Sequence, residues 1–452
     1  MKKYFYLFQC TLVAALGGLL FGFDTAVISG AEEKLQSLWE LSNFWHGFTT
    51  ASALIGTIVG SLIAGKPADR FGRRTTLFGI AFLYLFSALG SALAWDWYSF
   101  VLFRLMGGIG VGGASVVSPL YIAETSPANI RGRLVALVQF NIVFGILLAY
   151  LSNFFIDALK LGEVEWRWMF GVEAFPAFLF FLLLLLTPRS PRWLVTQNHH
   201  EEAEEVLLKL GNSKEQTATE LAAIEQSLKM DQHRLEEPFF QKVYAQPIFL
   251  AIAIAAFNQL SGINAILYYS KRIFVMAGAG DSAALLNSVG IGIVNLLFTS
   301  LAIFVIDYIG RKKLMIVGSI GYILSLSITA WAFLQFDSGE QAEGVGSLIV
   351  LGSLMLFIAA HAFGQGAVIW VFISEIFPNR VRARGQALGS FTHWVMAAVI
   401  SWTFPLFADL TGGYIFAFYA LMMVFQLIWV IFYMPETKGV PLEEIQKRLG
   451  IE

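Results

Sequence analysis

The sequence predicts an all-α membrane protein in which twelve transmembrane helices form two pseudo-symmetric six-helix bundles, with short cytoplasmic helices between them. Three observations support this fold class. Apolar residues make up 57% of the 452 residues and charged residues only 14%, whereas soluble domains carry about a quarter charged residues. Two sets of six segments are apolar enough to cross a bilayer. Polar motifs recur at equivalent places in both sets.

Each predicted span satisfies the length rule that about 30 Å of hydrocarbon requires roughly 20 mostly apolar residues. The first six lie near 5–29, 46–65, 76–95, 98–122, 134–156 and 168–187, and the second six near 247–275, 285–308, 313–335, 346–374, 385–408 and 413–434. The predicted domains are therefore an N-terminal bundle (1–188), a cytoplasmic linker with short amphipathic helices (189–245), a C-terminal bundle (246–434) and a cytoplasmic tail (435–452).

The distribution of Lys and Arg predicts the orientation, because these residues accumulate in short cytoplasmic loops. With both termini inside, the inner segments hold Lys2, Lys3, Lys66, Arg70, Arg73, Arg74, Arg131, Arg133, Arg311, Lys312, Lys313, Arg380, Arg382 and Arg384. The outer loops hold only Lys34, Lys160, Arg167, Lys271 and Arg272. We expect a multi-pass protein of the inner (plasma) membrane. Its first apolar run is too long for a cleaved signal and is expected to be retained.

Several classes of function are disfavoured. The net charge of −2 gives no basic field for nucleic acid. The single cysteine, Cys10, excludes an internal disulfide and offers no metal cluster. No nucleophile–base pair, phosphate loop or metal constellation lies in or beside the spans, so we expect neither an enzyme nor a cofactor or metal.

Internal repeats point to transport. "ADRFGRR" (68–74) follows the second span and "IDYIGRKK" (306–313) the eighth, while "AETSPANIR" (123–131) follows the fourth and "SEIFPNRVR" (374–382) the tenth. Repeated halves are typical of secondary transporters, which bind substrate between them. Topology accounts for many of the basic residues but not for the acidic ones. We therefore predict a cytoplasmic gate formed by Asp69, Arg70, Arg73, Arg74, Glu124, Arg131, Asp307, Arg311, Lys312, Glu375 and Arg382.

These motifs, together with "RLMGGIGVGGASVVSPLYIAETSPANIRG" (104–132), "SPRWL" (190–194), "NQLSGINAILYYS" (258–270), "SEIFP" (374–378) and "PETKG" (435–439), resemble the sugar porter family of the major facilitator superfamily. That family contains bacterial proton–sugar symporters and animal facilitative glucose transporters. The resemblance implies alternating access to a central monosaccharide site, and we expect the transporter to be monomeric in the lipid bilayer.

A sugar site needs amides, which donate and accept hydrogen bonds, and flat aromatic faces. Three amides within "NQLSGIN" favour such a site over simple interhelical contacts, because Ser261 and Gly262 also loosen this helix. The resemblance implies sugar contacts for Gln139, Gln259, Asn264, Asn295, Trp370 and Trp394, and aromatic contacts or an outer gate for Phe21, Tyr268 and Tyr269. Asn258 and His393 are added to the predicted substrate-binding residues because they lie beside these positions in the seventh and eleventh spans. The chain departs from the family pattern at Asn258, His393 and Arg189, where Gln, an amide and Glu are usual.

An acidic residue in the first span, Asp24 in "GGLLFGFDTAVISG", is a functional hypothesis by default, because a membrane carboxylate costs at least a few kcal/mol. The resemblance implies that Asp24 can meet Arg104 of the fourth span. Burial raises the pKa of a carboxyl group and a neighbouring guanidinium lowers it, so separating such a pair would switch proton affinity.

The predicted coupling residues are Asp24, Arg104 and Glu173, the last a second intramembrane carboxylate that could relay the proton or merely face water. Within the family, symporters carry Asp at the position of Asp24 and uniporters carry Asn. We therefore predict import of a hexose or pentose by proton symport. The alternatives are a facilitative sugar or polyol uniporter, in which Asp24–Arg104 is a static pair, and a sugar sensor that does not transport.

Overall fold

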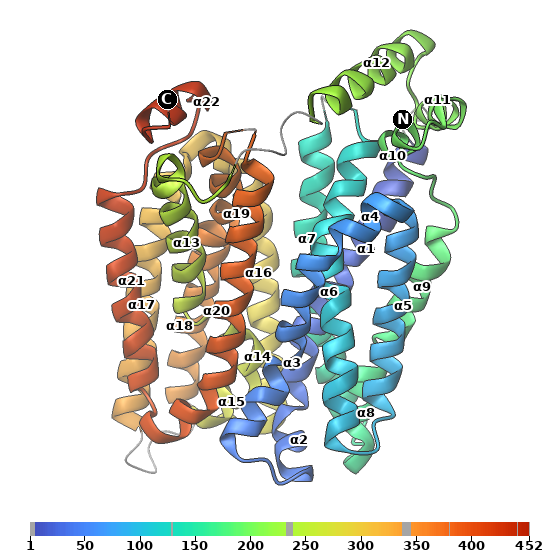
Figure 1. Cartoon of the computed structure of the whole chain (residues 1–452). Coiled ribbons are helices and arrows are strands. Elements are labelled where there is room, and N and C mark those ends of the chain that lie inside the picture. Colours follow the sequence, from blue (N-terminus) through green and yellow to red (C-terminus); the bar gives the residue numbers. More distant parts are fainter. Residues whose placement is uncertain are drawn as a thin grey trace. The chain divides into compact units, whose positions relative to one another are not determined.

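The computed structural model describes residues 5–127, 130–231, 238–336, 345–378, 380–440 and 442–451, and the regular structure within these ranges is helical throughout (Figure 1). The helices up to the linker are α1 (Phe5–Val27), α2 (Glu32–Leu38), α3 (Asn43–Ile63), α4 (Gly65–Phe71), α5 (Arg73–Ala92), α6 (Trp97–Thr125), α7 (Arg131–Ala158), α8 (Glu165–Gly171), α9 (Ala174–Leu184), α10 (Pro191–Thr196), α11 (His200–Lys209) and α12 (Lys214–Asp231).

The remaining helices are α13 (Ala245–Leu260), α14 (Ile263–Tyr268), α15 (Ser270–Met276), α16 (Asp281–Ile309), α17 (Arg311–Phe336), α18 (Val345–Phe363), α19 (Gln365–Ile376), α20 (Arg382–Thr411), α21 (Tyr414–Phe432) and α22 (Leu442–Arg448). Short 3-10 turns lie at Ile28–Gly30, Gly162–Val164 and Lys242–Tyr244.

All twelve predicted spans are confirmed, with ends that differ by a few residues. The described residues hold twelve helical segments long and apolar enough to cross a membrane: Phe5–Gly30, Asn43–Ile63, Arg73–Ala92, Trp97–Thr125, Arg131–Ala158, Gly162–Leu184, Lys242–Tyr268, Asp281–Ile309, Arg311–Gln335, Val345–Ile376, Arg382–Ala408 and Tyr414–Phe432. The predicted linker helices are also present, as α10, α11 and α12. Lys2 and Lys3, which contribute to the predicted orientation, lie outside the described residues.

Three of the predicted spans are broken rather than continuous. The sixth is interrupted at Val172 and Glu173, between α8 and α9. The seventh is interrupted at Gly262, whose φ of +83° is left-handed and suits glycine, and again at Tyr269 between α14 and α15. The tenth is interrupted at Gly364, between α18 and α19. Breaks of this kind free backbone groups within a span, and membrane proteins tolerate them where protein or a cavity surrounds them. The loosening expected at Ser261 and Gly262 is confirmed.

The chain divides into two compact units. Unit 1 comprises Met1–Asp24, Gly56–Gly145 and Phe170–Glu237, and unit 2 comprises Thr25–Ile55, Ile146–Met169 and Pro238–Glu452. The division therefore runs within α1, α3, α7 and α8. The predicted bundle boundaries at 188 and 246 remain predictions.

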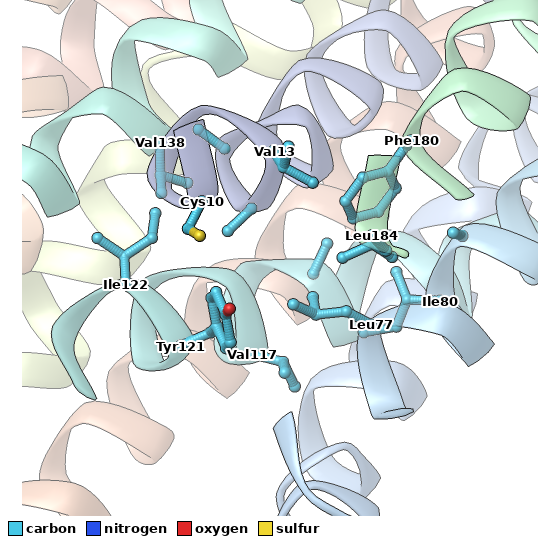
Figure 2. Packing of buried hydrophobic residues seen from close by; sticks show 14 of the residues in the cluster. Cys10, Val13, Leu77, Ile80, Val117, Tyr121, Ile122, Val138, Phe180 and Leu184 are labelled. Carbon is cyan, nitrogen blue, oxygen red and sulfur yellow. The ribbon is translucent and has the colours of Figure 1, made fainter. Parts of the chain in front are cut away.

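Each unit has its own apolar core. In unit 1 the core joins α1, α5, α6, α7 and α9, and Figure 2 shows Cys10 and Val13 of α1 facing Val117 and Tyr121 of α6. Small residues bring the helices close together, as at Gly60 of α3, where a Cβ atom would lie 2.2 Å from the carbonyl oxygen of Ile109 in α6. The core of unit 2 is formed mainly by α13, α19 and the end of α21, with α22 packed against it.

Candidate functional site

The predicted coupling pair meets inside unit 1. Nη1 of Arg104 donates to Oδ1 of Asp24, and Nη2 donates to the main-chain oxygen of the same residue at 3.2 Å. Asp24 is 2% exposed and Arg104 1% exposed. The Arg104 guanidinium also lies 5.3 Å from the centre of the Phe170 ring. A buried ion pair with these additional contacts joins the first and fourth spans.

Glu173 completes this group of charges. It lies between α8 and α9, it is 2% exposed, and its charge acts on both Asp24 and Arg104. Its Oε1 atom has no hydrogen-bond partner among the described residues. The two carboxyl groups and one guanidinium thus form a buried cluster with one acidic group in excess. A proton bound to one of these carboxyl groups would leave one carboxylate to balance the one guanidinium.

Six of the predicted sugar-binding residues belong to one part of unit 2. Three of them are the amides of the seventh span, where Gln259 donates to Oδ1 of Asn258 and accepts from Nδ2 of Asn264, both at 2.9 Å. The turn at Ser261 and Gly262 makes this contact possible, because it places Asn264 beyond the break and beside Gln259.

The other three come from α19 and α20. Nε2 of Gln259 lies 3.3 Å from Nε2 of His393. The centre of the His393 ring lies 5.1 Å from the ring centre of Trp370 and 4.8 Å from that of Trp394. Hydrogen-bonding amides and the imidazole therefore lie beside two indole rings. This combination suits a ligand with hydroxyl groups on a ring.

The other four predicted residues come from α1, α7, α14 and α16. Tyr268 is buried at the end of α14, and Asn295 is buried in α16, where its Oδ1 accepts from Thr299 at 3.3 Å. Phe21 of α1 and Gln139 of α7 are half-buried in unit 1. Their roles in binding remain predictions.

Sequence reasoning missed a second polar group in unit 2. Nδ1 of His361 lies 2.5 Å from the Tyr322 hydroxyl, which donates to Oε1 of Gln365 at 3.4 Å. Nε2 of Gln365 donates to the carbonyl oxygen of Ile254, one turn before Asn258. The presence of His361 and Gln365 four residues apart in an apolar span is the sequence feature that predicts this group.

The gate residues predicted for the first half form a network within unit 1. Arg73 contacts Glu124 and the exposed Asp69, each at 2.9 Å, and donates to the carbonyl oxygen of Ala68. The Ser190 hydroxyl donates to Oε2 of Glu124 at 2.5 Å. This serine also caps α10, with Pro191 at the first helical position, so the linker begins at the network.

The repeated motifs form the matching network in unit 2. Arg311 contacts Glu375 at 2.7 Å and Asp307 at 3.1 Å, and the Thr437 hydroxyl donates to Glu375 at 2.6 Å. Arg311, Asp307, Glu375 and Thr437 thus take the places of Arg73, Asp69, Glu124 and Ser190. The similarity of the two halves, read from the spacing of the motifs, extends to their hydrogen bonds.

The remaining gate residues have other contacts. Arg131 donates to the carbonyl oxygen of Ser126 and lies 3.9 Å from Glu220 of α12, whereas its counterpart Arg382 donates to the carbonyl oxygen of Phe377. The Nη2 atom of Arg382 has no partner among the described residues. The other three lie against neighbouring chain: Arg70 over the Phe71 ring, Arg74 on the carbonyl oxygen atoms of Leu184 and Leu185, and Lys312 on that of Ile431.

The two networks differ by one carboxylate, at a position where the first repeat departs from the family pattern. Glu436, in "PETKG", accepts from the main-chain nitrogen atoms of Arg311 and Lys312 at 3.0 and 3.1 Å and so caps α17. The corresponding position before Ser190 is Arg189, which cannot accept a hydrogen bond and instead lies 3.5 Å from Glu202 of α11. The first repeat therefore lacks this carboxylate cap.

Comparisons with known proteins show which family the chain belongs to. The model of the family described as "Sugar (and other) transporter" matches residues 10–449. The D-xylose-proton symporter of Escherichia coli (strain K12) is 40% identical, over 98% of this chain and 95% of its own. The arabinose-proton symporter of Bacillus subtilis is 37% identical, over 96% and 93%.

A solved structure of XylE, described as a major facilitator superfamily proton:xylose symporter bound to 6-bromo-6-deoxy-D-glucose, superimposes with a TM-score of 0.79. The two chains are 39% identical, and the match covers 98% of this chain and 99% of that one. The predicted fold class is therefore confirmed as the major facilitator fold. The protein is a multi-pass membrane protein, and it belongs to the sugar transporter family.

Proposed function

We propose that the protein imports a monosaccharide, a hexose or pentose, together with protons by alternating access. The observation that carries this proposal is the buried contact of Asp24 with Arg104 beside Glu173. Relatives named as proton symporters of D-xylose and of arabinose support it.

The chemistry of coupling follows from the excess acidic group. A proton taken up by Asp24 removes the negative charge that holds Arg104, and Arg104 is then attracted to Glu173 instead. The strength of the contact between the first and fourth spans thus depends on protonation. If one conformation stabilises the protonated cluster and the other the ionised cluster, the proton and the conformational change are linked. Glu173 is then the second group that can bind the proton or form an ion pair with Arg104.

The substrate role of unit 2 follows from its donors and acceptors. Asn258, Gln259, Asn264 and His393 offer both functions to sugar hydroxyl groups, and Trp370 and Trp394 offer apolar faces to the C–H surfaces of the ring. The resemblance to the family assigns four further residues to the same substrate: Phe21, Gln139, Tyr268 and Asn295.

The charged networks at the ends of the spans are proposed to form the cytoplasmic gate. Each carboxylate is already bound to an arginine of its own repeat, so a change of partner exchanges one ion pair for another at little net free energy. This proposal places both termini in the cytoplasm and the protein, as a monomer, in the inner membrane. A transport role without covalent chemistry also implies that it is not an enzyme and needs no cofactor.

The test of this function is competition for sugar uptake at two external pH values. Cells or vesicles containing the protein take up labelled xylose in the presence of unlabelled pentoses, hexoses and polyols. We expect monosaccharides to compete, and uptake to increase at the lower external pH. Uptake that no sugar inhibits would contradict the substrate class, and uptake independent of pH would contradict the coupling.

Replacement of Gln259 with Ala is expected to lower the apparent affinity for sugar about tenfold or more. Gln259 contacts Asn258, Asn264 and His393, and groups left unpaired cost about 1–3 kcal/mol. The measurement is equilibrium binding or KM in proteoliposomes. Gln426→Ala is the matched control, because this buried amide of unit 2 bonds to Ser319 away from the cluster. Equal loss of affinity in both variants would contradict the assignment.

A further inference from the structure

A second buried ionic cluster lies in unit 2, away from the residues assigned above. Oε2 of Glu32 in α2 lies 2.6 Å from Nε2 of His46 in α3 and 3.5 Å from Nη1 of Arg272 in α15. The same Nη1 donates to Oε1 of Gln36 at 2.9 Å. Glu32 and His46 are each 1% exposed, and the side chain of Arg272 is 12% exposed. We call Glu32, His46 and Arg272 the Glu32 cluster.

The geometry gives each residue of the Glu32 cluster a role. A guanidinium can only donate, so His46 Nε2 cannot both accept from Arg272 and donate to Glu32. The shorter contact, with the carboxylate, assigns the ring proton to Nε2, and His46 then orients Glu32 toward Arg272. Oε1 of Glu32 and Nδ1 of His46 have no partner among the described residues.

The position of Arg272 connects the Glu32 cluster to the sugar site. Arg272 lies in α15, which only Tyr269 separates from α14, the helix of Asn264. Tyr269 lies edge-to-face with His46, stacks on Phe404 and donates to the carbonyl oxygen of Ser401. Contacts from α3 and α20 therefore hold the second break of the seventh span, and α2 contacts Arg272 directly after it.

Further charges surround the Glu32 cluster. Lys271 lies 3.3 Å from Glu33 and 3.6 Å from the exposed Asp281. Burial, with the neighbouring charge of Glu32, raises the pKa of the Glu33 carboxyl group above its ordinary value. Counting the carboxylates Glu32, Glu33 and Asp281 against Lys271 and Arg272 leaves one negative charge when His46 is neutral. The charges of α2 and α15 are thus complementary, which favours contact between them.

Stability alone is a poor reason for such a cluster, because apolar residues of similar volume are often as stabilising as a buried ion pair. Because the net stabilisation from such a pair is small, the contact can break reversibly, and water then solvates both charges. We propose that Glu32, His46 and Arg272 form a latch that closes one face of the transporter by holding α15 against α2 and α3, and that sugar crosses this face only after Arg272 leaves Glu32. With a cytoplasmic N-terminus this face is extracellular, so the inference rests on the proposed function.

The experiment compares Glu32→Gln, Arg272→Gln and the double variant with the wild-type chain. Asp281→Asn is the matched control, because it removes an exposed carboxylate from the same surface. The first measurement needs no sugar: hydrogen–deuterium exchange of residues 270–276 in the purified protein. We expect faster exchange in the three latch variants and wild-type exchange in the control. Unchanged exchange in the latch variants would overturn the proposal.

The second measurement is the apparent KM for sugar from each side of oriented vesicles. An opened latch favours the outward-facing state, so the ratio of external to internal KM is expected to fall about tenfold, as a loss of about 1.4 kcal/mol produces. A purely structural role would shift both values together, and that result would overturn the latch. Absence of transport by the wild-type chain would instead contradict the proposed function, while the exchange measurement still tests the latch.

The role of His46 is tested by two replacements. His46→Gln retains a side-chain N–H donor for Glu32 and is expected to keep most of the wild-type KM ratio, whereas His46→Leu is expected to behave like Glu32→Gln. Equal effects of the two replacements would contradict the positioning role of His46.

Discussion

Replacement of Asp24 with Asn is expected to abolish sugar accumulation against a gradient while leaving sugar exchange largely intact. Asn has nearly the same shape and can still accept a hydrogen bond from Arg104, but it cannot bind or release a proton. The clustered amides proposed to bind sugar, Asn258, Gln259 and Asn264, lie in unit 2 and are not altered. The measurement compares accumulation driven by an imposed pH gradient with exchange of labelled for unlabelled sugar in the same proteoliposomes.

The Asp281→Asn variant controls for loss of an acidic residue, because this exposed carboxylate is not part of the coupling cluster. It is expected to accumulate sugar like the wild type. An Asp24→Asn variant that still concentrates sugar would show that the proton is carried elsewhere. A variant that loses exchange as well would assign Asp24 to binding rather than coupling.

Replacement of Arg104 with Gln is expected to have the largest effect on stability. It leaves Asp24 buried beside Glu173 without their common counter-charge, and removing one member of a buried pair costs about 3–5 kcal/mol. The measurements are the yield of monodisperse protein and its thermal unfolding in detergent. Both are expected to fall well below the wild-type values.

The double variant Asp24→Asn with Arg104→Gln separates stability from coupling. The double variant removes the Asp24 carboxylate together with its partner and leaves Glu173 as the one carboxyl group of the cluster, so thermal stability should recover part of the way toward the wild-type value. Accumulation should remain absent, because the amide introduced in place of the Asp24 carboxyl group does not titrate. If the single Arg104 variant is as stable as the wild type, the buried pair does not have the energetic role assigned to it.

Much of the fold follows from the sequence because the bilayer imposes simple requirements. Long apolar segments predict the twelve spans, and the repeated spacing of Asp, Gly, Glu and Pro predicts the equivalence of the two charged networks. The resemblance to the sugar porter family implies the contact of Asp24 with Arg104, and two opposite charges in apolar spans have few other partners.

Other features leave no signal in hydropathy. The breaks at Tyr269 and Gly364 occur inside apolar runs that could equally form continuous helices, and tertiary contacts decide the outcome. The hydrogen bonds of Ser190 to Glu124 and of Thr437 to Glu375 depend on the path of the chain after the sixth and twelfth spans. The Glu32 cluster also escaped prediction, because Glu32, His46 and Arg272 are far apart in the sequence and individually resemble loop charges.

The central claim, proton-coupled sugar import, is tested most directly by uptake into proteoliposomes with no energy source other than an imposed pH gradient. With the lumen more alkaline than the medium, the wild-type protein is expected to accumulate sugar above the external concentration, and a protonophore should release it. Equilibration to the external concentration, unaffected by the gradient, would contradict the claim and indicate facilitated diffusion.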